Sequence, residues 1–146
     1  LSMKKIDFDN LLNLFFKEDV SHNTTTYTNL TSTPLYWLGM HTKLILNHIN
    51  FRKKAIRLLK NSNMELDPAE LAAAGEVIAY NRAWFYIKKI DLSNKDHVEA
   101  ILAHGDDFLE TSLELAIKHF QSPEREEYEK CLHLLEVLKL SKELRL

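Results

Sequence analysis

Apolar residues recur three and four positions apart along most of the chain, which is the spacing that places them on one face of an α-helix. Strict alternation of apolar and polar residues, which is typical of a half-buried strand, does not extend over any useful length. The clearest helical stripe consists of Val98, Ile101, Leu102, Gly105, Phe108, Leu109, Ser112, Leu113, Ala116, His119 and Phe120. The pattern predicts an all-α protein.

Four capping signals divide this pattern into helices. Each of the three prolines follows a residue that caps helix N-termini, and proline is itself favoured at the first helical position. The capping signals are Thr33-Pro34, Asp67-Pro68, Ser122-Pro123 and, without proline, Asn94. We therefore predict long helices over residues 34–60, 68–90, 94–120 and 123–144.

Short connections between long helices favour antiparallel neighbours. The predicted architecture is an up-down-up-down bundle of four helices over residues 34–146. Residues 1–33 form a separate unit, with a short helix over residues 7–17 and a Thr-rich loop. The apolar face of this short helix, formed by Phe8, Leu11, Leu12, Phe15 and Phe16, must dock on its own bundle or on another chain. Docking on another chain would give a homodimer.

Composition narrows the class of protein. A chain of 146 residues suits one domain with its own core, and a single cysteine excludes an internal disulfide. The net charge of −2 makes general nucleic-acid binding an unfavoured function. The chain contains neither an apolar run long enough to span a membrane nor a secretory signal at its start, so we expect a cytoplasmic or nuclear location.

Motifs of catalysis are missing. The sequence has no nucleophile elbow, no phosphate-binding glycine loop and no dinucleotide fingerprint. Cys131 shares a helix face with Tyr128, Leu132 and Leu135, whereas His133, two residues away, points elsewhere. We interpret Cys131 as a buried structural thiol and expect neither enzymatic activity nor a cofactor.

The histidines raise the question of a metal site. His41 and His48 lie seven residues apart, as do His97 and His104, which separates each pair by about 10.5 Å along a helix. Such a pair cannot share one ion without help from another helix, and no histidine follows a glutamate by three residues, the spacing that carboxylate-bridged bundles use. We predict no metal site, and a metal- or small-molecule-binding bundle stays an alternative.

The one dense run of charge lies at the end of the helix over residues 34–60. Basic residues there interact favourably with the helix dipole. They could also bind a phosphoinositide headgroup or a nucleic acid, with Arg52, Lys53, Arg57 and Lys60 as the candidate anion-binding residues.

Aromatic residues indicate an interaction surface. Trp84, Phe85 and Tyr86 follow one another and span about 200° of a helix, so they cannot all face one core. We predict a non-catalytic module that binds a segment of a partner protein in a groove between helices. Its candidate binding residues are Trp37, Tyr80, Trp84, Phe85 and Tyr86.

Two further patterns complete the predictions. Gly105 and the small-residue run that ends at Gly75 are interpreted as matching surfaces where helices pack closely.

The segments over residues 116–120 and 128–132 resemble helix segments of tetratricopeptide repeats. These helices are too long for a 34-residue period and no internal repeat is found, so a repeat-like helical scaffold is only an alternative.

Overall fold

The computed structural model describes residues 30–61, 65 and 67–143, and this part of the chain is helical without any strand. The all-α class is thus confirmed. The helices are α3 (Pro34–Lys60), α4 (Pro68–Ile87), α5 (Lys95–His104), α6 (Asp107–Phe120) and α7 (Tyr128–Glu143). None of these helices could span a membrane. The predicted helix over residues 7–17 lies outside the described residues.

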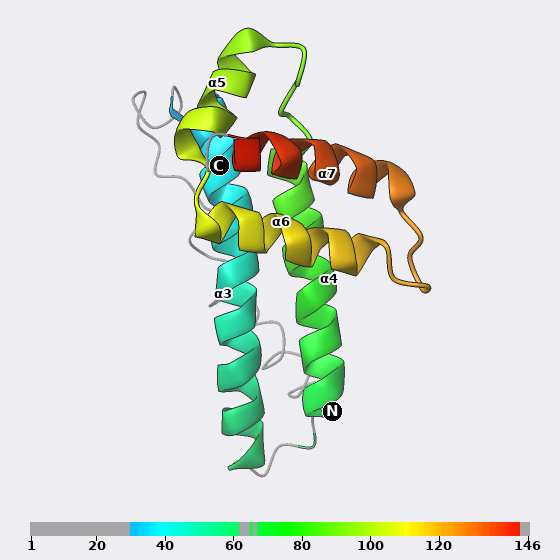
Figure 1. The fold of residues 1–146 in the computed structure, drawn as a ribbon. Helices are drawn as coiled ribbons and strands as arrows, with labels where there is room; N and C mark the ends of the chain where they lie inside the picture. Colours follow the sequence, from blue (N-terminus) through cyan, green and yellow to red (C-terminus); the bar gives the residue numbers. More distant parts are fainter. Residues whose placement is uncertain (1–29, 62–64, 66, 144–146) are drawn as a thin grey trace.

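Helices α3 and α4 form a long antiparallel hairpin (Figure 1). Both begin where the sequence predicts. The Tyr36 amide donates to Thr33 Oγ1 at 3.2 Å, the Ala69 amide donates to a carboxylate oxygen of Asp67 at 2.9 Å, and each cap is followed by proline. These contacts satisfy amides that have no partner within the helix. Helix α4 ends at Ile87, three residues earlier than predicted.

The predicted continuous helix over residues 94–120 is wrong, because the chain leaves the helical conformation at Gly105 (φ −62°, ψ 116°). Asp106 then starts a new helix, since its carboxylate accepts from the Leu109 amide at 2.8 Å. The apolar spacing continues through the break because α5 and α6 both face the core, through Ile101 and Leu109. Periodicity alone could not reveal the change of direction.

The last helix begins at Tyr128, so the predicted start at Ser122-Pro123 is also wrong. The amides of Arg125 and Glu126 both donate to the Ser122 carbonyl at 2.9 Å, which closes a turn there. Glu126 has a φ of 49°, which a helix cannot accommodate. The capping signal therefore starts a turn and not a helix.

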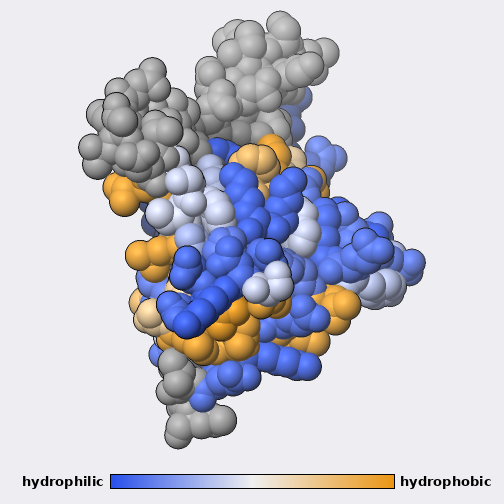
Figure 2. Space-filling model, turned by 90° about the horizontal axis from the view of Figure 1, so that it is seen from above, coloured by the Kyte–Doolittle hydropathy of each residue, from blue (hydrophilic) through white to orange (hydrophobic). Residues whose placement is uncertain are grey.

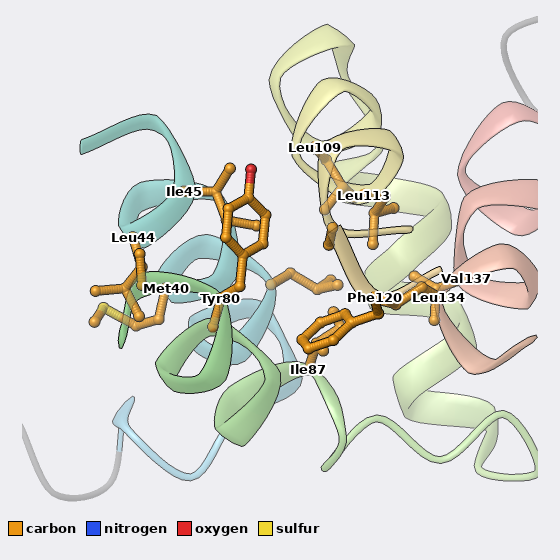
Figure 3. Packing of buried hydrophobic residues seen from close by; sticks show 14 of the residues in the cluster. Met40, Leu44, Ile45, Tyr80, Ile87, Leu109, Leu113, Phe120, Leu134 and Val137 are labelled. Atoms are coloured by element: carbon orange, nitrogen blue, oxygen red, sulfur yellow. The ribbon is translucent and has the colours of Figure 1, made fainter. Parts of the chain in front are cut away.

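The up-down-up-down bundle is not confirmed. Figure 1 shows α6 and α7 lying across the upper half of the α3–α4 hairpin, with α5 above them, while the lower half extends beyond these helices. The core lies at the crossing, where Tyr80 and Ile87 of α4, Phe120 of α6, and Leu134 and Val137 of α7 are buried (Figure 3).

Two glycines permit close approach, as the sequence indicates, but they do not face each other. A Cβ at Gly105 would lie 2.8 Å from the Ser141 carbonyl oxygen of α7. A Cβ at Gly75 would lie 2.8 Å from Cε1 of Phe51 on α3. Gly105 thus lets the α5–α6 junction approach the α7 backbone, and Gly75 makes room for an aromatic ring inside the hairpin.

Candidate functional site

The five aromatic candidates separate into two sets. Tyr80 is 4% exposed and Trp84 is half-buried, with its ring 6.2 Å from Phe120 and 5.6 Å from His133. Tyr80 is therefore not accessible to a partner, since it belongs to the packing between α4 and α6. The other three candidates, Trp37, Phe85 and Tyr86, come together where α3 begins and α4 ends.

At this place three aromatic rings lie around the ammonium group of one lysine. Lys89 Nζ lies 4.3 Å from the ring centroid of Phe85, 5.5 Å from that of Tyr86 and 5.8 Å from that of Trp37. Lys88 Nζ lies 5.3 Å from Phe85, and Tyr36 meets the Tyr86 ring edge-on at 6.0 Å. We call this group the aromatic–lysine patch; its members are Tyr36, Trp37, Phe85, Tyr86, Lys88 and Lys89.

Local contacts hold Trp37 in place. Its Nε1 donates to the Thr31 carbonyl at 2.9 Å, and its ring meets His97 of α5 edge-on at 5.4 Å. His97 is oriented in turn, because its Nδ1 accepts from the Asp91 amide at 2.9 Å. The start of α3, the α4–α5 connection and α5 thus meet at one indole ring.

A cavity of about 390 Å³ adjoins the patch on α4, lined by Asn81, Arg82, Phe85 and Tyr86. Its described lining comes from α4 alone, so it is an open hollow on the helix surface and not an enclosed pocket. Phe85, which lines the cavity, is 50% exposed. From above, the described surface is largely hydrophilic, and hydrophobic side chains gather in groups along its margins (Figure 2).

The charge of the patch is positive. Lys88 and Lys89 are exposed, and within the described part of the chain their recorded interactions are with aromatic rings and not with carboxylates. A cation over an aromatic face keeps its capacity to bind an anion. The patch can therefore bind a carboxylate and an apolar side chain next to each other.

Among the described residues, no group of three His, Cys, Asp or Glu side chains is placed to hold a metal ion. His41 and His48 are buried on α3, and His104 lies at the end of α5. Ser112 Oγ donates its proton to the Leu109 carbonyl at 2.8 Å. The 3.2 Å contact between His41 Nδ1 and Ser112 Oγ therefore has the imidazole as donor and the hydroxyl as acceptor. Burial lowers the pKa of His41 to about 3, so the ring is neutral.

His48 and His119 both contact the Tyr80 ring, with 6.0 Å and 4.3 Å between the ring centroids. His119 Nδ1 also lies 3.4 Å from Oε1 of Glu76. Burial lowers the pKa of both histidines, although the Glu76 carboxylate opposes the shift. This buried group joins α3, α4 and α6, and we interpret it as structural.

The basic candidates Arg52, Lys53, Arg57 and Lys60 are all exposed near the end of α3, and none has an ion pair within the described residues. Arg52 lies fifteen residues beyond Trp37, or about 22 Å along the helix at 1.5 Å per residue. The basic candidates and the aromatic–lysine patch are therefore two separate surfaces.

The structure also presents an apolar surface that the sequence did not predict. Tyr128, Leu132 and Leu135 of α7 are 62%, 59% and 39% exposed, because α7 turns a different stripe toward the core. Cys131, at the edge of the exposed stripe, is half-buried, and its thiol donates to the Ile117 carbonyl at 3.6 Å. Burial raises the pKa of this thiol, which disfavours the nucleophilic thiolate.

Comparisons of the chain with protein families, curated proteins and solved structures gave no significant match.

Proposed function

We propose that the protein is a non-catalytic interaction module, and that its aromatic–lysine patch binds a segment of a partner protein that carries acidic and large apolar side chains. The expectation of a cytoplasmic or nuclear location is part of this proposal. The observation that carries it is the position of Lys89, 4.3 Å from a Phe85 ring that is itself half exposed beside a cavity.

The composition of the patch supports this function. Aromatic side chains dominate the energetics of protein interfaces, because they bury a large area with few rotatable bonds. The two lysines add attraction for carboxylates, which favours acidic partners over basic ones. The patch draws on α3, α4 and the two lysines that follow α4, so it is a surface between helices.

Site-specific photo-crosslinking in cells tests the proposal. A photo-reactive phenylalanine is placed at position 85 of the full chain, and a matched control carries it at Phe108, which is 64% exposed on α6. We expect cross-linked partner peptides at position 85 that are rich in acidic and apolar residues, and that disappear with the Lys89→Glu substitution. Identical products at positions 85 and 108 would show that the patch is not a specific surface.

The exposed basic residues at the end of α3 support a second candidate function, the binding of an anionic ligand. Arg52, Lys53, Arg57 and Lys60 have no ion pair within the described residues, so their charges are available to phosphate groups. Stabilisation by the helix dipole explains Arg57 and Lys60, which lie in the last turn of α3, but it does not explain Arg52 and Lys53.

A further inference from the structure

The chain itself contains a segment with the chemistry that the aromatic–lysine patch selects. Residues 7–19 carry four acidic side chains, Asp7, Asp9, Glu18 and Asp19, against a single Lys17. Between these charges lie the large apolar residues Phe8, Leu11, Leu12, Leu14, Phe15 and Phe16. The segment lies outside the described residues, so this comparison rests on its sequence.

The patch complements this segment in both charge and apolar character. Its ionisable side chains other than tyrosine are Lys88 and Lys89, and the adjoining cavity is lined by one more cation, Arg82. The half-exposed ring of Phe85 and the cavity of about 390 Å³ offer a place for an aromatic anchor. An acidic segment with phenylalanines satisfies both requirements, whereas a basic segment would meet like charge.

The connection to the segment reaches the described structure next to the patch. The described chain begins at Leu30, and the following Thr31 accepts the hydrogen bond from the Trp37 indole at 2.9 Å. Eleven residues from Asp19 to Leu30 can extend over roughly 36–40 Å at 3.3–3.6 Å each. The segment therefore needs no stretched connection to reach Phe85, and a short tether gives an effective concentration of about millimolar.

We propose that residues 7–19 dock on the aromatic–lysine patch of their own chain and compete there with the partner segment. This inference rests on the proposed function, because it names an internal competitor for the same surface. The partner must then displace a tethered segment of similar chemistry, which lowers its apparent affinity.

The first test asks what lies on Phe85 in the purified full chain. A photo-reactive phenylalanine at position 85 should cross-link to the peptide that contains residues 7–19 within a monomer, while the control at position 108 should not. Mixing isotope-labelled and unlabelled chains identifies which copy supplies the segment. A product that joins labelled and unlabelled chains would show that a second copy is the occupant, and the absence of any link to residues 7–19 would likewise overturn the proposal.

The second test measures competition with a fluorescent synthetic peptide of residues 7–19. We expect it to bind the full chain with the substitutions Phe8→Ala, Phe15→Ala and Phe16→Ala at least about tenfold more tightly than the unaltered chain, because the internal competitor is weakened. Unchanged far-ultraviolet circular dichroism and unfolding midpoint serve as the folding control.

The outcomes separate this inference from the proposed function. Equal binding of the peptide to both chains, abolished by Lys89→Glu, would overturn docking in cis and leave the patch as a binding site. Binding that neither Phe85→Ala nor Lys89→Glu weakens would overturn both proposals, since the peptide would then bind elsewhere.

Discussion

The ring of Tyr80 lies flat against the imidazole of His119, with 4.3 Å between the ring centroids and 9° between their planes. This contact joins α4 to α6, and Glu76 adds a polar contact to the same imidazole. Burial and, to a smaller extent, the negative charge of Glu76 raise the pKa of Tyr80 to about 12. The phenol is thus neutral at physiological pH, and protonation of His119 would place a charge inside this buried contact.

Stability should fall when the pH is lowered below about 6.5. The pKa of His41 falls from 6.5 to about 3 in the folded protein, so between these values the unfolded chain binds more protons than the folded one. For one such group, the free energy of unfolding falls by about 1.4 kcal/mol for each pH unit between these two pKa values. Burial shifts the pKa of His48 and of His119 in the same direction.

Urea unfolding at pH 7.5 and 5.5 measures this dependence. The free energy of unfolding should be lower by at least about 1 kcal/mol at pH 5.5. His41→Gln removes one titrating group and should reduce the difference between the two pH values. Equal stability of the unaltered chain at both pH values would contradict the assignment of neutral, buried histidines.

Substitution of two consecutive aromatic residues of α4 should have different effects, a loss of stability at Trp84 and a loss of binding at Phe85. Trp84→Ala removes a half-buried ring that contacts Phe120 and His133, and should lower the free energy of unfolding by about 3 kcal/mol. Phe85→Ala removes a ring that is 50% exposed, so stability should change by less than about 1 kcal/mol while binding at the aromatic–lysine patch is lost. Urea unfolding and the peptide-binding assay check the two effects, and a large loss of stability in Phe85→Ala would show that this ring is structural.

Glycine substitutions test the close contact between the α5–α6 junction and α7. Alanine at position 105 would place a Cβ 2.8 Å from the Ser141 carbonyl oxygen, and backbone cannot move aside as a flexible side chain can. Gly105→Ala should therefore cost about 1–3 kcal/mol, and Gly105→Leu should cost more. Gly39→Ala is the matched control, since no atom lies within 4 Å of the added Cβ and alanine should stabilise α3 by up to about 1 kcal/mol. Equal unfolding midpoints for the two alanine variants would contradict this packing.

The basic residues of α3 yield a prediction that separates the two candidate functions. If they bind anions, affinity for vesicles that contain a phosphoinositide should fall steeply with salt, as expected for binding through released counterions. Replacing Arg52 and Lys53 by glutamine should weaken that binding and leave the peptide assay unchanged. Vesicle binding that neither salt nor these substitutions affects would remove the anion-binding candidate.

Helix starts that depend on neighbouring residues could be predicted from the sequence. The bounds of α3 are those predicted, and α4 begins as predicted, because Thr33 and Asp67 satisfy amides only two or three residues away. The same local chemistry explains an error: Ser122-Pro123 suits a turn as well as a helix start, and the fold uses it as a turn. Close packing at Gly75 and Gly105 was also predictable, although the elements that they approach were not.

The sequence by itself determined that the chain is helical and where its first long helices begin. Tertiary packing decided the rest. Helix α7 has two apolar stripes, and its contacts with α5 and α6 determined that Leu134 and Val137 are buried while Leu132 stays exposed. The crossing of the hairpin by α6 and α7 buries Tyr80, and the meeting of α3 with the end of α4 joins Trp37 to Lys89. Capping depends on residues a few positions apart, whereas burial depends on residues that are distant in the chain and adjacent only after folding.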